Sequence, residues 1–208
     1  FPILGKKRIE KALETTSKFL RSIEDQTLKL MNQGKSLNQV LHEVKIPNDL
    51  MELPWLTPIY DDPQFLIRMV WRRYGGWWDG EYDRLLPAPR KDEALAWVEL
   101  SNGIENIILK ALENLDKGNF KVAAQLIETA LHADDDNKQM HDARAKIYRE
   151  FSLKQSSSMG RNILNHASMA SAQGIAILNH DSPRCCAPRL FFVTTPLTLE
   201  FSLAQAWS

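Results

Sequence analysis

The sequence of 208 residues contains few cysteines: only Cys185 and Cys186, which are adjacent. Adjacent cysteines rarely form a disulfide with each other, and the sequence has no Cys-x-x-Cys pair of the kind that binds zinc. An excess of charge is also lacking, because 26 Lys and Arg residues balance 26 Asp and Glu residues. Bulk charge therefore gives no reason to expect nucleic acid or an anionic membrane as a partner.

Long apolar runs are absent as well. No stretch approaches the ~20 apolar residues of a transmembrane helix, so no membrane span is predicted. Residues 1–5 do not read as part of a signal peptide, because no charged region precedes an apolar one. The content of 44% hydrophobic and 25% charged residues is that of an ordinary soluble globular protein. The sequence does not indicate a compartment.

Motifs for catalysis and for metal binding are missing too. The five histidines form neither an H-x-H-x-D-H nor an H-E-x-x-H cluster. The acidic run 134–136 has neither the glycine nor the glutamate that a calcium-binding loop requires, and is read as a helix-capping turn. No serine-hydrolase elbow, P-loop or dinucleotide fingerprint occurs. We therefore predict no catalytic, cofactor-binding or metal-binding residue in this chain.

Helical periodicity is what the sequence does contain. Apolar residues at alternating steps of four and three predict a helix over 6–33, ended by Gly34. The proline-rich segment 47–63 carries large apolar side chains and is predicted to be a connector pinned across a hydrophobic surface. A helix from 62 to 74 follows, and then the aromatic turn 77–80, where we expect one tryptophan to pack against the connector.

The second half of the sequence is predicted to be helical throughout. Apolar stripes over 104–115, 120–131 and 140–151 follow a short helix that begins near residue 92, and a last helix is expected within 156–173. The fold class is therefore all-α. Strand character occurs only at Leu190–Thr195, within a tail of different composition.

Residues 112–147 resemble one tetratricopeptide-type helix hairpin, with small residues where two helices would approach closely. A repeat array needs about three or more stacked units, and no second copy is present. The hairpin is read either as one element of an all-α domain or as part of a peptide-binding groove.

The hairpin stripes carry more apolar surface than one small hairpin needs, which predicts a two-fold symmetric homodimer. In the alternative, helix 6–33 and the connector cover this surface within one chain. The candidate interface residues are Ile107, Ile108, Leu112, Ile127, Leu131 and Ile147.

Several local sequences together resemble the alkyl sulfatases, enzymes of the metallo-β-lactamase superfamily that carry a helical dimerisation domain. They lie at 25–34, 53–60, 74–80, 86–89, 118–120 and 157–159. The resemblance covers roughly residues 1–170. Its most specific part is the motif formed by Tyr74, Gly75, Gly76, Trp77, Asp79 and Gly80.

The resemblance implies a domain order. Residues 1–57 would be the C-terminal remnant of a metallo-β-lactamase-like domain, including its closing helix, and a connector. Residues 58–176 would be the dimerisation domain, followed by an atypical tail over 177–208. The chain is expected to begin just after the last zinc-binding histidine of a longer parent.

The resemblance also implies a function. The full-length parent would hydrolyse sulfate esters with a dinuclear zinc site. None of those zinc ligands maps onto this chain, so the chain alone is expected to be an inactive dimerisation module. The alternative is a stand-alone helical adaptor that binds other proteins.

Overall fold

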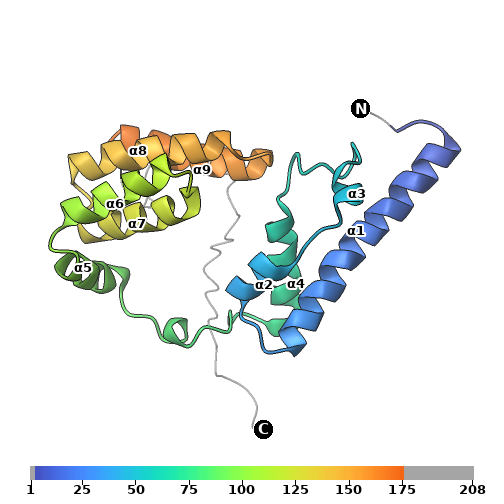
Figure 1. The fold of residues 1–208 in the computed structure, drawn as a ribbon, viewed down its shortest axis with the longest axis horizontal. Coiled ribbons are helices and arrows are strands. Elements are labelled where there is room, and N and C mark those ends of the chain that lie inside the picture. The colour runs from blue at the N-terminus through green and yellow to red at the C-terminus, as the bar shows by residue number, and fades with distance from the viewer. Residues whose placement is uncertain (1–2, 176–208) are drawn as a thin grey trace, which may run out of the picture. The chain divides into compact units, whose positions relative to one another are not determined.

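The computed structural model describes residues 3–175, which contain nine α-helices, one 3-10 helix and no strand (Figure 1). The predicted all-α class is confirmed. The tail 177–208, with the strand character at Leu190–Thr195, lies outside the described residues. The elements are α1 (Lys6–Asn32), α2 (Leu37–Glu43), α3 (Asn48–Met51), α4 (Pro63–Gly75), η1 (Tyr82–Arg84), α5 (Arg90–Leu100), α6 (Ile104–Asp116), α7 (Phe120–Ala133), α8 (Lys138–Leu153) and α9 (Ser158–Ala172).

The first helices begin where local capping chemistry places them. The Ser36 side chain accepts from the backbone N–H of Gln39, whose own side chain accepts from the N–H of Ser36, so α2 starts with a capping box. Asp62 caps α4 by accepting from the N–H of Gln64 at 2.8 Å, and proline occupies the first helical position. The start of α4 agrees with the helix predicted from residue 62.

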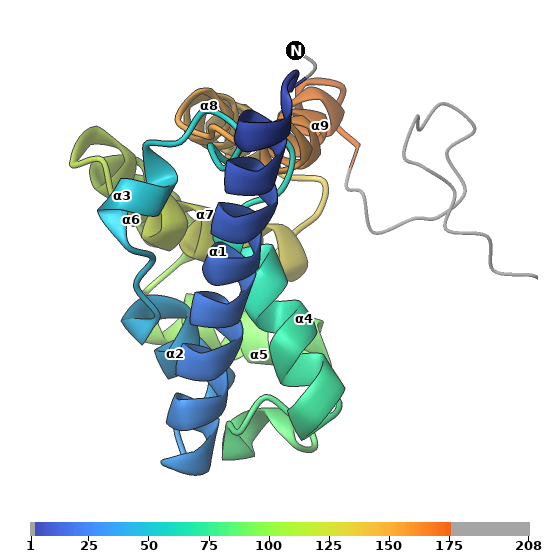
Figure 2. The same cartoon turned by 90° about the vertical axis from the view of Figure 1, so that its right-hand side faces the viewer.

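One hydrophobic core joins α1, α2 and α4, which contact one another (Figure 2). The connector is pinned across it as predicted, since Leu50 and Leu56 are buried there and the Trp55 indole N–H donates to Thr15 Oγ1 at 3.0 Å. The core thus draws on residues from both sides of residue 57. Its buried members are Phe19, Ile23, Val40, Leu41, Leu50, Leu56, Ile67 and Trp71.

A second core lies among α6, α7 and α8, and α9 packs against α8. The three apolar stripes predicted from the sequence are confirmed as these three helices. Alanines at the contacts let the helix backbones approach closely, and the rings of Phe120 and Phe151 stack with centroids 5.8 Å apart. The alanines buried in this core are Ala111, Ala123, Ala130 and Ala143.

The start of α9 is bonded to the connector. The Ser157 hydroxyl accepts from the N–H of Gly160 and so caps α9, and it also donates to the carbonyl of Tyr60 at 2.6 Å. The N–H of Ser158 donates to the carbonyl of Ile59 at 2.7 Å. Two family-like segments, 53–60 and 157–159, therefore meet through backbone hydrogen bonds, a contact that sequence spacing alone does not reveal.

Candidate functional site

The motif 74–80 forms a loop that is fastened to neighbouring helices. The Tyr74 hydroxyl donates to Glu24 of α1 at 2.7 Å, and this bond to a carboxylate raises the pKa of Tyr74. The indole N–H of Trp71 donates to the carbonyl of Trp78 at 2.9 Å. The carbonyl of Asp79 accepts from the first N–H of α2, that of Leu37, at 2.8 Å. These bonds join α1, α2 and α4 at one place.

Gly80 is the point of this loop that requires glycine, and Gly75 lies close to a flexible neighbouring side chain. Gly80 has φ +86°, and a Cβ atom there would lie 3.1 Å from the Cα of Ser36, closer than backbone contacts normally allow. At Gly75, in the last turn of α4, a Cβ would lie 2.8 Å from the terminal methyl of Met31. The motif therefore fits the loop tightly against α1 and the start of α2, which is a structural role.

The remainder of the motif builds the turn after α4. Asp79 accepts from the N–H of Glu81 and pairs with Arg84 at 2.8 Å. Trp78 donates to the carbonyl of Glu81 and meets the ring of Tyr82 edge-on, with centroids 5.6 Å apart. Trp77 is 80% exposed. Contrary to the expectation that one of these tryptophans packs against the connector, neither belongs to the described core that contains the connector.

The six residues predicted for a dimer interface come together, but in the interior of one chain. Five of them are at most 4% exposed in the core of α6, α7 and α8, and Leu112 packs against the same core. The sequence periodicity identified the apolar faces correctly. Neighbouring helices of the same chain cover these faces, and neither helix 6–33 nor the connector contributes to this core. Five of the side chains are therefore covered within the single chain, whereas Leu112 stays partly exposed.

Exposed apolar side chains occur on several elements, and the segment between α4 and α6 carries some of them. Its most exposed members outside α5 are Tyr82 at 83% and Leu86 at 89%. Within α5, Leu95, Trp97 and Leu100 are about half exposed or more, and Ala94 is the helix's one buried residue. Sequence reasoning missed this surface, although α5 has apolar residues around its whole circumference, a pattern that signals further burial.

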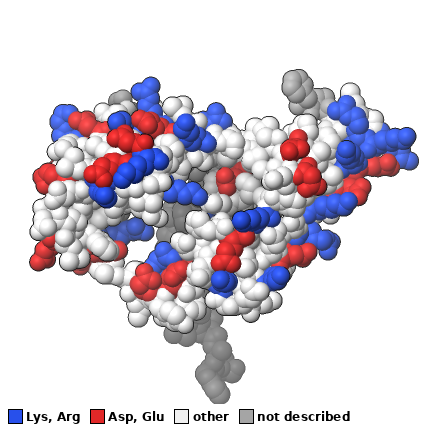
Figure 3. Space-filling model, in the orientation of Figure 1, with Lys and Arg blue, Asp and Glu red and all other residues white. Residues whose placement is uncertain are grey.

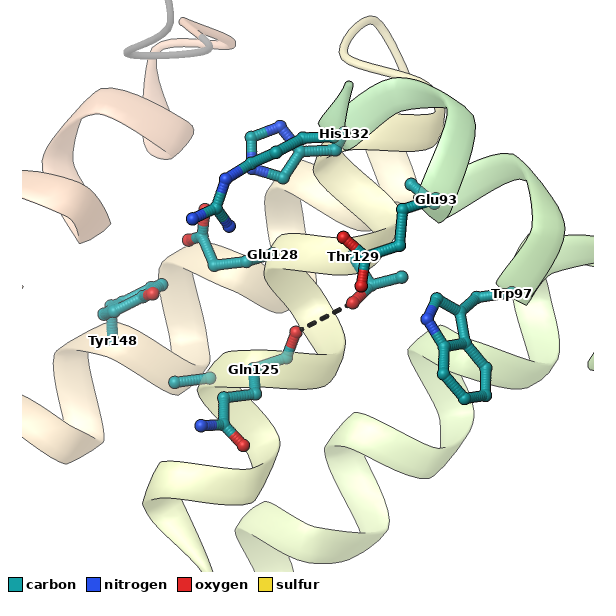
Figure 4. A pocket seen from close by; sticks show the side chains of 10 residues that line it. Glu93, Trp97, Gln125, Glu128, Thr129, His132 and Tyr148 are labelled. Atoms are coloured by element: carbon teal, nitrogen blue, oxygen red, sulfur yellow. Dashed lines mark hydrogen bonds between the residues drawn. The ribbon is translucent and has the colours of Figure 1, made fainter. Parts of the chain in front are cut away.

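A cavity of about 320 Å³ lies between α5, α7 and α8. Figure 4 shows the rings of Trp97 and Tyr148 on two sides of it, with Gln125, Glu128 and His132 of α7 between them. Burial raises the pKa of Tyr148, and the neighbouring carboxylate of Glu128 raises it further. The cavity is thus polar with aromatic walls.

Beneath this cavity, a buried arginine links three helices. Arg144 of α8 donates to Glu128 of α7 at 2.7 Å and to Ser171 of α9 at 2.8 Å, and its guanidinium lies 4.9 Å from the centroid of Tyr148. The ring of His141, also buried, is within hydrogen-bonding distance of Ser171 and of the Asp135 carbonyl. Each of these buried polar groups therefore has a partner, as burial demands.

The described residues do not form a metal centre, and the face in Figure 3 carries no large area of one charge sign. Residues 3–175 contain no group of three or more His, Cys, Asp and Glu side chains able to hold an ion. Charges of both signs are intermixed on the face shown in Figure 3. No described helix is long and apolar enough to cross a membrane.

The match to a known family decides what this arrangement is. A family model described as alkyl sulfatase dimerisation matches residues 36–174. This chain belongs to the alkyl sulfatase dimerisation family. The match runs from the cap of α2 to just past the end of α9 and includes the motif 74–80, whereas α1 precedes it. The family resemblance seen in the sequence is thereby confirmed.

Members and relatives of the family carry alkylsulfatase names. The chain is 29% identical over 149 residues to a linear primary-alkylsulfatase of Pseudomonas sp. (strain ATCC 19151), a match that covers 71% of this chain and 28% of that protein. It is 27% identical over 176 residues to the alkyl/aryl-sulfatase BDS1 of Saccharomyces cerevisiae, covering 84% of this chain and 27% of the yeast protein.

A solved structure agrees with the fold. The stereoselective inverting sec-alkylsulfatase Pisa1 from Pseudomonas sp. matches with a TM-score of 0.78 at 25% identity, over 85% of this chain and 28% of that chain. The dimerisation chain described here therefore spans less than a third of the length of each of these three relatives.

Proposed function

We propose that this chain is the dimerisation module of an alkylsulfatase-like metallohydrolase and that two copies associate into a homodimer. The family match over residues 36–174 carries the proposal. The exposed apolar side chains between α4 and α6 support it, because a partner that covered them would remove apolar surface from water.

Within the parent, residues 1–57 would close a metallo-β-lactamase-like domain and connect it to the dimerisation domain, 58–176, with 177–208 as a tail. A groove between α1 and α4, lined by Leu20, Leu66 and Met69, supports this arrangement as a seat for the rest of such a domain. The family match starts at residue 36, after α1, which fits an origin of that helix outside the dimerisation domain.

Sulfate ester hydrolysis at a dinuclear zinc site would belong to that parent. Catalytic zinc sites need at least three protein ligands, and the described residues of this chain do not group three such side chains. The donor set of residues 3–175 does not fit zinc, so the zinc ligands would belong to other parts of the parent.

Sedimentation of the chain over a wide micromolar range tests the homodimer. The expected species has twice the 23.8 kDa of one chain. A species that keeps the single-chain mass at every concentration would reject the proposal. Metal analysis and an alkyl sulfate hydrolysis assay on the same sample should find neither stoichiometric zinc nor turnover, and two tightly bound zinc ions per chain would contradict the assignment.

A stand-alone adaptor for peptides is the second candidate, and the aromatic-walled cavity beside α5 is the observation that favours it. The reading frame upstream of Phe1 discriminates between the two candidates. An H-x-H-x-D-H motif encoded there supports the module of a metallohydrolase, and its absence supports the adaptor.

A further inference from the structure

The exposed surface of α5 carries a charge pattern that complements itself. Lys91, Leu95 and Glu99 are spaced at i, i+4 and i+8, so their side chains share one stripe along the helix. All three are exposed, and neither Lys91 nor Glu99 takes part in the ion pairs formed among residues 3–175. The stripe therefore offers a cation at its start, an apolar centre and an anion at its end.

Only one orientation of a second α5 places opposite charges of the two stripes against each other. In an antiparallel pair related by a two-fold axis, Lys91 of one copy faces Glu99 of the partner subunit, and the reverse contact follows by symmetry. The two Leu95 side chains then meet near the axis, because Leu95 lies midway between the two charges. A parallel pair would place Lys91 opposite a second lysine and Glu99 opposite a second glutamate.

The packing geometry of helices suits such a pair. Side chains spaced four residues apart form the ridges that interlock when two helices cross in the commonest class of helix packing. Ala94 holds α5 against α7 within the chain, and the stripe lies beside that contact and stays open to solvent. The stripe spans roughly 12 Å along the helix axis, at 1.5 Å per residue.

A helix of 11 residues is smaller than a stable interface, which uses about 20–30 residues on each side. The proposed pairing draws additional surface from the segment that leads into α5, where Tyr82 and Leu86 are more than four-fifths exposed. This arrangement has an apolar centre with charges at its rim, which is how protein interfaces are usually organised.

We propose that a second copy of this chain docks on α5 in an antiparallel, two-fold symmetric pairing through Lys91, Leu95 and Glu99. The pairing rests on the homodimer proposed above and specifies its surface. It assigns the contact to residues outside the buried core of α6, α7 and α8, so the fold of each copy stays unchanged on association.

Charge reversal and charge exchange test the pairing. Lys91→Glu or Glu99→Lys turns two symmetry-related attractions into repulsions, which should raise the dimer dissociation constant roughly 30-fold at low salt. The double variant Lys91→Glu/Glu99→Lys recreates both pairs with their signs exchanged and should restore most of the affinity. Lys121→Glu, an exposed reversal on α7, is the matched control and should leave the constant unchanged.

Each result of sedimentation on these four variants has a defined meaning. Loss of affinity in both single variants with recovery in the double variant supports the pairing, because a folding defect would not be repaired by a second reversal. A dimer that is indifferent to all reversals overturns the pairing and leaves the homodimer standing. A chain that is monomeric at every concentration overturns the pairing together with the homodimer.

Discussion

Replacing Gly80 by alanine should destabilise the protein by about 2–3 kcal/mol. An L-residue in the left-handed region, where Gly80 has φ +86°, costs roughly 1–2 kcal/mol. The new Cβ would stand 3.1 Å from the Cα of Ser36, and backbone on both sides leaves little room for relief. Moving the loop away would stretch the 2.8 Å bond from the Leu37 N–H to the Asp79 carbonyl, which contributes about 1 kcal/mol.

Gly34 provides the matched control. Its φ of +76° is close to that of Gly80, but a Cβ at Gly34 would meet no atom within 4 Å. Gly34→Ala should therefore reduce the free energy of unfolding only by the conformational cost of roughly 1–2 kcal/mol. Urea unfolding of both variants, at unchanged m-value, measures the difference in the free energy of unfolding. Equal losses in the two variants would refute the close approach of Gly80 to α2 as the reason for glycine in the motif.

Three further outcomes follow from the second core. Ile127→Ala, at a side chain with 0% exposure, should cost about 3–4 kcal/mol in urea unfolding, whereas Leu109→Ala, at 54% exposure, should cost less than ~0.5 kcal/mol. Arg144→Met should cost about 3 kcal/mol because it leaves Glu128 unpaired, and adding Glu128→Gln should recover part of the loss in a double-mutant cycle. Burial raises the pKa of Tyr148 in the folded state above its value of about 10 in the unfolded chain. The contribution of Tyr148 to the free energy of unfolding is therefore complete below about pH 10 and is lost as the pH rises beyond it. Tyr148→Phe should flatten the decline of the urea midpoint above about pH 10, and an identical decline in both proteins would contradict the assigned cause.

Local chemistry explains why most helices could be predicted from the sequence. The capping serine before α2 and the Asp-Pro start of α4 act on backbone groups two or three residues away, so their effect is visible in the sequence. Helix α1 was predicted over 6–33 and spans Lys6–Asn32. Helix α5 begins at Arg90, two residues before the predicted start, because the proline at its cap leaves the first turn without a side-chain signal.

The proposed partner surface could not be predicted from the sequence in the same way. Periodicity identifies an apolar face but does not say which element covers it. Ile108 and Ile127 lie in segments with a clear helical periodicity of apolar residues, and other helices of the same chain bury both side chains fully. Helix α5 has no clear apolar stripe, since Leu95, Trp97 and Leu100 point in different directions around the helix, and these residues remain exposed. The position of the family motif could be read from the sequence, but its contact with Ser36 depends on the folded chain.

The motif and the proposed interface are connected by the chain between them. At the beginning of this segment, the carbonyl of Asp79 is hydrogen-bonded to α2, and at its end the buried Ala94 packs α5 against α7. The exposed Tyr82 and Leu86 lie between these two contacts. A surface that is ordered before association loses less conformational entropy on binding. Gly80→Ala should weaken the contact between Asp79 and α2 without changing α5. It should therefore weaken self-association by more than its effect on folding explains. Gly34→Ala lies outside the segment and should leave self-association unchanged, so equal dissociation constants for the two variants would show that order in this segment does not contribute to the dimer.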